Sequence, residues 1–349
     1  MKTINNGSKN IAAVASGKRC KWWKRRGSKS RGFKYFDAAD KLITDERQIE
    51  RIKSLVIPPA WAHVRICPSS NGKMQAIGID SAGRIQYKYS PKFSASQQEK
   101  KFQKIERFGE YLPSLRRLTN EHIALDGLPK EKVLAVVMRL INDLYIRVGS
   151  EKSVKEYKTY GVTTLRNRHL TIEKQGRLNF NFVGKHHIRH RRLIVDRELA
   201  TIMTDLKSIG GSKLFNYLDD NGKARPITPR DVNDYLKNAT APEFSAKDFR
   251  TWGATVLAAS ELSEIGTAET KTQINKNIVR AIRSVAEHLG NTPAVCRSSY
   301  IHPFVIEAYQ QGITLDEFRP RRKRTIDRLA PEYSIEEVAL LKMLKKAKA

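Results

Sequence analysis

The chain has 349 residues, of which 40% are hydrophobic, so two domains with separate cores suit it better than one. Its 65 lysines and arginines outnumber 36 aspartates and glutamates and leave a formal net charge of +29. This excess goes beyond what solubility needs and indicates a polyanionic partner; nucleic acid is favoured over a membrane, because no run of about 18 apolar residues exists.

The first predicted domain, residues 1–92, is small and mostly β. Its basic segment 17–34 carries nine lysines or arginines and no acid, interleaved with aromatic residues. That composition is typical of an arm that contacts a nucleic-acid backbone, and a solvated arm with two partly buried tryptophans explains it equally well. From residue 57 to Tyr89, prolines and then alternating apolar and polar residues predict strands joined by turns at 70–72 and 80–83.

The second predicted domain, residues 93–349, is larger and mainly helical, which makes the fold class α+β. Six apolar residues at steps of three and four predict a buried helix that ends near Gly149. They are Val133, Val136, Val137, Leu140, Ile141 and Leu144. Alternation returns at 169–194 and predicts a three-stranded antiparallel sheet inside this domain.

The rest of the chain is predicted to be helical. Ser245 can cap a helix that carries Phe249 and Trp252, which we expect to be core residues, and Thr292 before a proline can cap another. A basic run at 319–324 precedes a short amphipathic helix at 335–344.

Cysteine usage and the N-terminus both favour a reduced setting. Cys20, Cys67 and Cys296 lie far apart, which excludes a disulfide framework and a Cys-x-x-Cys zinc site. The first ten residues are polar and only a short run of small residues follows, so we expect no export signal and a cytoplasmic, nucleoid-associated protein.

The residues that can carry chemistry are cations and one tyrosine at the ends of predicted elements. Cleaving a phosphodiester without a metal requires a nucleophile, donors for the non-bridging oxygens and a proton for the leaving 5′ oxygen. Tyr300 can attack, while Arg147 and Arg250 can donate bidentate hydrogen bonds and Lys185 can release a proton. No glycine-rich phosphate loop or magnesium-type acidic cluster is evident.

Histidines near Lys185 raise the question of a metal site. His186 and His190 stand four residues apart, but in strands and hairpins that spacing does not converge on one ion. A basic turn that faces DNA, with His187 included, is the favoured interpretation, and no metal is expected.

Five stretches, 146–149, 160–165, 182–185, 247–252 and 298–303, resemble in their order the catalytic domain of type IB DNA topoisomerases, especially the bacterial and poxvirus kind. Residues 57–61 and 80–89 are similar to the family's β domain. The resemblance covers nearly the whole chain. It implies two domains that form a C-shaped clamp on double-stranded DNA.

The resemblance also implies a role for each catalytic position. Tyr300 attacks the scissile phosphate and holds the 3′ end as a phosphotyrosine, Arg147 and Arg250 grip its oxygens, and Lys185 protonates the 5′ oxygen. The fifth family position is often histidine and is Asn291 here. Asparagine can still donate one neutral hydrogen bond to a phosphate oxygen.

Outside this set, Gln86, Tyr87 and Tyr89 match positions that contact DNA bases or backbone in the viral relatives. A half-buried strand face explains the alternating tyrosines about as well. Two stretches depart from the family pattern: residues 150–154, where asparagine and tyrosine are more usual, and 186–187, where Ser-Gly is common.

The implied activity is relaxation of positively and negatively supercoiled DNA by a monomer that cuts, swivels and reseals one strand without ATP, metal or another cofactor. A tyrosine recombinase is one alternative, although its second arginine usually follows a histidine three residues earlier, where Lys247 stands here. A basic DNA-binding protein without enzymatic activity is the other alternative.

Overall fold

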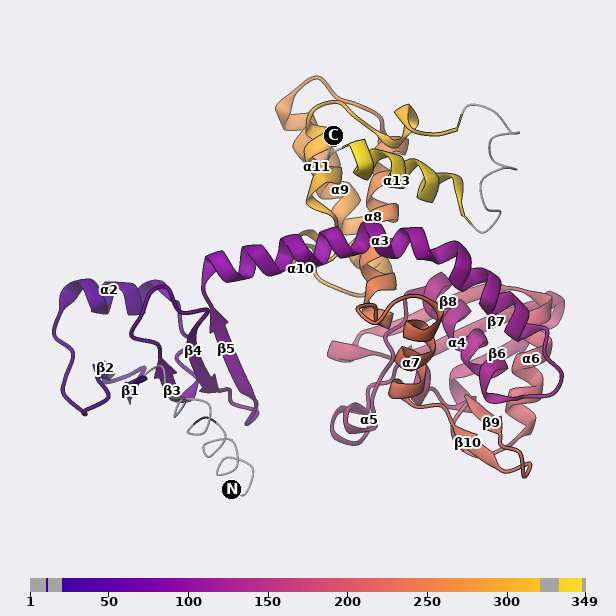
Figure 1. Ribbon diagram of the computed structural model, residues 1–349, viewed down its shortest axis with the longest axis horizontal. Helices are drawn as coiled ribbons and strands as arrows, with labels where there is room; N and C mark the ends of the chain where they lie inside the picture. Colours follow the sequence, from indigo (N-terminus) through magenta and orange to yellow (C-terminus); the bar gives the residue numbers. More distant parts are fainter. Residues whose placement is uncertain (1–10, 12–20, 321–332, 347–349) are drawn as a thin grey trace. The chain divides into compact units, whose positions relative to one another are not determined.

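The computed structural model describes Ile11, residues 21–320 and residues 333–346, and the chain divides into two compact units, Met1–Lys101 and Phe102–Ala349. The mixed α/β class agrees with the sequence: the first unit holds a five-stranded sheet, and the second is mostly helical with a three-stranded sheet (Figure 1). The sequence-based boundary at 92/93 lies near the start of α3 (Pro91–Ile123), a helix that runs through the division between the units.

The first unit is one antiparallel sheet with an apolar cluster on each face. The strand order is β2-β1-β3-β4-β5. Its elements are β1 (Trp23–Ser28), β2 (Gly32–Phe36), α2 (Glu46–Ser54), β3 (Ala62–Ile66), β4 (Met74–Ile79) and β5 (Ile85–Tyr89). Ala76 packs with Trp23 and Ile77 packs with Trp22, because successive residues of β4 point to opposite faces. Both tryptophans are therefore partly buried, one on each face.

The basic segment 17–34 is mostly not an arm. Residues 17–20 lie outside the described part of the chain, but β1 and β2 pair as a hairpin in which Arg25 stands opposite Tyr35. The Arg25 guanidinium lies 4.2 Å from the Phe33 ring centroid and donates to the backbone oxygen of Trp61 at 2.6 Å. The alternating aromatic residues supply the apolar contacts that turn a charged stretch into sheet.

The second unit surrounds its sheet with helices. The helices after α3 are α4 (Lys130–Leu144), α5 (Glu151–Tyr157), α6 (Arg197–Ser208), α7 (Pro229–Ala239), α8 (Ala246–Ile265), α9 (Lys271–Leu289), α10 (Pro293–Ser299), α11 (Pro303–Gln310) and α13 (Ile335–Lys346). The predicted sheet is confirmed as β6 (Leu170–Glu173), β7 (Arg177–Val183) and β8 (Arg189–Val195), in the order β6-β7-β8. Among the described residues no helix is both long and apolar enough to cross a bilayer.

A two-stranded hairpin interrupts the part of the chain that was predicted to be helical throughout. It consists of β9 (Asn216–Leu218) and β10 (Ala224–Pro226). The Asp219 carboxylate accepts hydrogen bonds from the backbone N–H groups of Asn221 at 3.2 Å and Lys223 at 2.9 Å, which fixes the turn. An Asn-Gly pair at 221–222 is a hairpin signal that the sequence analysis overlooked.

The buried helix predicted to end near Gly149 is α4, and it ends at Leu144. Tyr145 adopts a left-handed conformation with φ 51°, and its N–H closes the last turn on the Ile141 carbonyl. The Tyr145 ring lies so close to Gly253 of α8 that any β-carbon there would overlap it. Arg147 therefore lies after the end of α4, in a segment without regular secondary structure, and the packing of Tyr145 on Gly253 ties this segment to α8.

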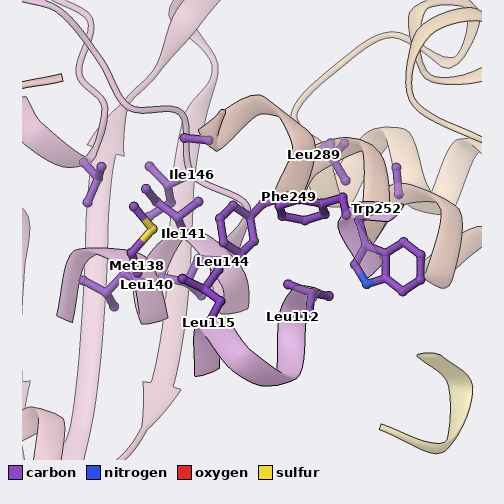
Figure 2. Close-up of a cluster of buried hydrophobic side chains, with 14 of the residues drawn as sticks. Leu112, Leu115, Met138, Leu140, Ile141, Leu144, Ile146, Phe249, Trp252 and Leu289 are labelled. Atoms are coloured by element: carbon purple, nitrogen blue, oxygen red, sulfur yellow. The ribbon is translucent and has the colours of Figure 1, made fainter. Parts of the chain in front are cut away.

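The core of the second unit forms where α3, α4 and α8 meet (Figure 2). Leu112 and Leu115 of α3 lie beside Leu144 of α4, with Phe249 and Trp252 of α8 close by. Burying a side chain of this size contributes about 1.5–3 kcal/mol. Phe249 and Trp252 are therefore core residues, as predicted, and they fix the helix that carries Arg250.

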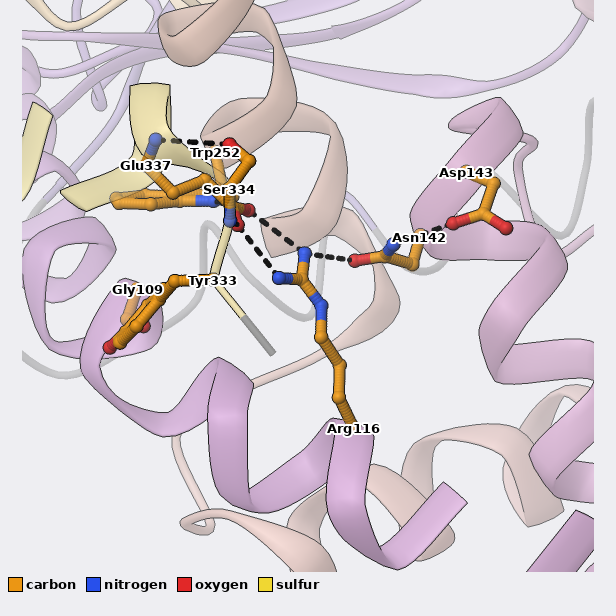
Figure 3. Close-up of polar contacts among 8 residues, drawn as sticks. All are labelled: Gly109, Arg116, Asn142, Asp143, Trp252, Tyr333, Ser334 and Glu337. Carbon is orange, nitrogen blue, oxygen red and sulfur yellow. Dashed lines mark hydrogen bonds and ion pairs between the residues drawn. The ribbon is translucent and has the colours of Figure 1, made fainter. Parts of the chain in front are cut away.

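A buried ion pair joins α13 to this core (Figure 3). Arg116 donates to both carboxylate oxygens of Glu337, at 2.7 and 2.8 Å, and to Asn142 Oδ1 at 2.9 Å. Trp252 Nε1 donates to Glu337 Oε1 at 2.9 Å. The helix predicted at 335–344 is confirmed as α13, which exposes Lys342, Lys345 and Lys346 and is buried from Glu337 through Leu341, where the charge of Glu337 is paired.

Candidate active site

The second unit contains all five predicted catalytic residues, and the structure brings them together. Arg147, Lys185, Arg250 and Tyr300 line one cavity of about 950 Å³. Asn291 adjoins it, because its Oδ1 accepts a hydrogen bond of 2.5 Å from Nη2 of Arg147. Residues separated by up to 153 positions in the sequence, from Arg147 to Tyr300, thus share one site.

Arg250 organises the centre of the site. It lies in the second turn of α8, whose N-cap residue Ser245 donates its backbone N–H to the Asp248 carboxylate at 2.8 Å. Arg250 as a whole is only 4% exposed; its guanidinium donates to the backbone carbonyl of Tyr145 and, at 2.9 Å, to that of Leu289. Burial, together with the charge of Arg147, lowers the pKa of Arg250 to about 10, so it remains a cation at neutral pH.

Those two carbonyls belong to the segments that present the neighbouring site residues. Tyr145 stands two residues before Arg147, and Leu289 stands two residues before Asn291. Gly290 ends α9 in a left-handed conformation, after which the backbone N–H of Asn291 bonds to the Ala286 carbonyl at 2.9 Å. Arg250 therefore fixes the segment before Arg147 and the segment before Asn291 relative to each other, and its positive charge lies at the cavity.

Tyr300 follows directly after α10, which the Thr292 side chain caps as predicted. Its backbone carbonyl accepts a hydrogen bond of 3.2 Å from Oγ1 of Thr255, a residue of α8. The guanidinium carbon of Arg250 lies 5.3 Å from the Tyr300 ring centroid. Helix α8 thus anchors both the arginine and the backbone of the tyrosine.

The surroundings of Tyr300 favour its ionised form. Burial raises the pKa of the phenol, but the charge and hydrogen bond of Arg250, together with the charge of Arg147, outweigh burial. The pKa of Tyr300 consequently lies below its ordinary value of 10. A phenolate in this position is a better nucleophile than a free tyrosine at the same pH.

Lys185 lies at the tip of the β7–β8 hairpin, where it is exposed and lines the same cavity. The loop closes through a 2.8 Å hydrogen bond from the Gly184 N–H to the Ile188 carbonyl. His186 and His187 both adopt positive φ, 63° and 59°, which is uncommon for residues other than glycine. The departure from Ser-Gly at 186–187 therefore falls where a glycine would be least strained.

His190 does not belong to an exposed basic turn, contrary to the prediction. It is only 9% exposed, and its ring stacks on Phe182 with centroids 5.1 Å apart. Within residues 21–320 and 333–346, together with Ile11, no group of three His, Cys, Asp or Glu side chains could hold a metal ion.

Sequence reasoning missed several residues of the cavity. Arg230 and Lys237 of α7 and Lys247 of α8 line it with the predicted set. Residues 230 and 237 stand seven apart on one helix face, a spacing that could have indicated them. Thr255 was missed as well. Its position as a polar residue on the buried side of α8 could have indicated a role in the site.

The predicted DNA-contacting residues lie in the first unit, on β5. Tyr87 and Tyr89 are 42% and 45% exposed, and their rings stack with centroids 6.1 Å apart, so they do share one face. Gln86 differs, because its amide donates to the carboxylate of Asp80 at 2.9 Å within the preceding turn.

Comparison with known proteins agrees with this arrangement. Residues 90–325 match the family model of the eukaryotic DNA topoisomerase I catalytic core, and residues 32–80 match that of the bacterial DNA topoisomerase IB N-terminal domain. A DNA topoisomerase 1B of Acanthamoeba polyphaga mimivirus is 33% identical over 285 residues, 80% of this chain and 84% of the viral protein.

More distant relatives show the same kinship. The DNA topoisomerase 1B of vaccinia virus (strain Copenhagen) is 25% identical over 241 residues, which cover 69% of this chain and 74% of that protein. A DNA topoisomerase 1 of Mycosarcoma maydis is 28% identical over 193 residues, 49% of this chain but only 19% of that longer protein. The chain belongs to the type IB DNA topoisomerase family.

Proposed function

We propose that this enzyme relaxes positively and negatively supercoiled duplex DNA by cutting and resealing one strand, with Tyr300 as the nucleophile. The observation that carries the proposal is the convergence of Arg147, Lys185, Arg250 and Tyr300 on one cavity, with Asn291 bonded to Arg147. The names of the mimivirus and vaccinia relatives, DNA topoisomerase 1B, support DNA as the substrate.

The chemistry is a transesterification that conserves the phosphodiester energy. Tyr300 loses its phenolic proton to solvent, and its oxygen forms a bond to phosphorus while the bond from phosphorus to the 5′ oxygen breaks. Lys185 gives a proton to that leaving oxygen, and the 3′ end remains attached as a phosphotyrosine. Arg147, Arg250 and Asn291 donate to the non-bridging oxygens as their negative charge grows. Resealing reverses each step.

The proposed cycle needs no ATP and no metal. Torque in the DNA drives the swivel, and a single tyrosine per chain cuts one strand, so a monomer suffices. The domains 1–92 and 93–349 would close as a C-shaped clamp around the duplex, with Gln86, Tyr87 and Tyr89 on the DNA. An enzyme of this kind would be associated with the nucleoid, where many lysines and arginines make its binding steeply salt-dependent.

The decisive experiment is relaxation of positively and negatively supercoiled plasmid in EDTA without ATP, comparing the wild type with Tyr300→Phe. We expect the wild type to relax both plasmids and Tyr300→Phe to bind DNA normally without relaxing either. Tyr217→Phe, which removes a hydroxyl from half-buried Tyr217 on β9, is the matched control and should stay active.

Three outcomes would reject the proposal. A requirement for metal or an active Tyr300→Phe enzyme would contradict the mechanism. Wild-type protein that binds plasmid without changing its linking number would instead favour the non-enzymatic DNA-binding alternative.

A further inference from the structure

The ring of His190 is wedged between two glycines from distant parts of the chain. A β-carbon placed on Gly184 would lie 2.6 Å from Cδ2 and Nε2 of this ring, and one placed on Gly290 would lie 2.7 Å from Cε1. Real β-carbons do not approach other atoms this closely, so both positions must be glycine for the ring to fit. Gly184 has φ −95°, which any residue can adopt, so only this contact excludes a side chain there.

Each of these glycines directly precedes a residue of the candidate active site. Gly184 leads into Lys185 at the hairpin tip, and Gly290 leads into Asn291 after α9. The imidazole ring therefore fills the space between the segment that carries the proposed proton donor and the segment that contacts the phosphate. The cavity beside the His190 ring has a volume of only about 10 Å³ and is also lined by Arg147, Lys185 and Arg250. The ring therefore has little room to move.

Further contacts keep the ring in place. His190 stands opposite Phe182 in the β7–β8 ladder and stacks on its ring. Two residues further along β8, Arg192 donates to the backbone carbonyl of His288, near the end of α9. Burial, with the charges of Arg192, Arg147 and Arg250, lowers the pKa of His190 to about 4. The imidazole ring is therefore neutral at pH 7.

Lys185 needs such support because little else holds it. Within the described part of the chain its side chain makes no hydrogen bond and no ion pair, and it is exposed at a tip with two left-handed histidines. Lys185 must deliver a proton to one oxygen. A backbone shift of about one ångström at such a residue lowers the reaction rate by roughly 10²-fold.

We propose that His190 is a positioning residue for the proton donor: its ring braces Gly184 against Gly290 and so holds Lys185 at the phosphate cavity. The inference deepens the proposed function and rests on it. It assigns His190 no proton transfer of its own.

The test uses two forms of one suicide oligonucleotide, the ordinary phosphodiester and the same strand with sulfur as the bridging 5′ atom. A thiolate leaves without being protonated, so a defect confined to the proton donor disappears on the sulfur substrate. We expect His190→Ala to cleave the ordinary substrate roughly 10²-fold more slowly and the sulfur substrate within about threefold of wild type. His169→Ala is the matched control, because His169 is equally buried and neighbours the same Phe182 ring; it should cleave both substrates at nearly the wild-type rate.

Two outcomes would overturn the inference. The first is cleavage of the ordinary substrate by His190→Ala at the wild-type rate. The second is an equal slowing on both substrates, which would assign the defect to groups other than Lys185. The proposed function is tested separately in the same experiment. If wild type cleaves neither substrate, or if Lys185→Ala is not rescued by sulfur, the assigned chemistry fails whatever His190 does.

A second variant keeps the test valid if His190→Ala does not fold. Gly184→Ala places a methyl group against the ring and should reproduce the slow, sulfur-rescued cleavage. When the ring is absent in His190→Ala, the methyl group has room. Adding Gly184→Ala to His190→Ala should therefore not slow cleavage further. If Gly184→Ala leaves cleavage of the ordinary substrate unchanged, the contact has no part in positioning Lys185.

Discussion

Arg250 in the second unit and Tyr89 in the first are both proposed to touch DNA, yet their surroundings differ. Arg250 is buried, bonded to the carbonyls of two separate segments and flanked by core residues. Tyr89 is exposed, and its contacts are the neighbouring rings of Tyr87 and Phe93. A buried charge is fixed before the substrate arrives, whereas an exposed ring can adapt to it. Changes around Arg250 should therefore abolish catalysis, whereas changes around Tyr89 should weaken DNA binding by degrees.

The sharpest test of this difference is Arg250→Lys, which keeps the charge but removes the planar fork. We expect single-turnover cleavage to fall by about 10²–10³-fold, because the compact ammonium group of lysine lacks the planar fork that reaches both carbonyls and still presents donors to a phosphate oxygen. Quenched reactions at saturating enzyme measure this rate. Arg280→Lys, at an exposed position of α9 with a loose ion pair to Glu261, is the control and should be unaffected. An Arg250→Lys enzyme within a few-fold of wild type would show that charge alone is sufficient.

The buried ion pair of α13 tests whether the second unit depends on fixed charge for stability as well. Glu337→Gln leaves Arg116 buried without its partner and should lower the free energy of unfolding by about 3 kcal/mol. Glu336→Gln, one residue away and half-buried, should change it by no more than about 0.5 kcal/mol. Denaturant unfolding measures both values.

The pH dependence of that difference has a definite sign. Burial raises the pKa of Glu337, but hydrogen bonding and charge from Arg116 outweigh burial, so the folded pKa lies below the ordinary 4.5. The stabilisation is therefore complete above the unfolded pKa and is lost as the pH falls through the folded value. Wild type and Glu337→Gln should converge in acid; curves that stay parallel would mean that the ion pair does not stabilise the fold.

Elements governed by local pattern were predictable from the sequence. Alternation predicted β6, β7 and β8, and the Ser245 and Thr292 caps marked the starts of α8 and α10. These features depend on residues within a few positions of one another. The order of five family-like stretches also indicated which side chains to follow.

Features set by contacts between distant segments were not predictable. Tyr145, the left-handed residue that follows α4, packs on Gly253 in α8, more than a hundred residues later. The sequence likewise could not show that Arg250 would hold the carbonyls of Tyr145 and Leu289, or that His190 would turn inward. The buried carboxylate of Glu337 in α13 is paired with Arg116, which stands 221 positions earlier.

The smallest expected effect is on the β5 face, and it tests the other side of the comparison. Tyr87→Ala and Tyr89→Ala should each weaken DNA binding by about 1 kcal/mol, roughly a fivefold rise in Kd, because each removes one exposed ring from the duplex. The double variant should lose less than the sum, since the two rings contact each other. Leu42→Ala, at an equally exposed apolar position of the first unit, should not alter binding. The salt dependence of Kd should keep its slope, because no charge is removed.

Cleavage by saturating Tyr87→Ala or Tyr89→Ala enzyme should stay at the wild-type rate. A slower rate with unchanged Kd would mean that these tyrosines act on the chemical step and that the two regions are not separable.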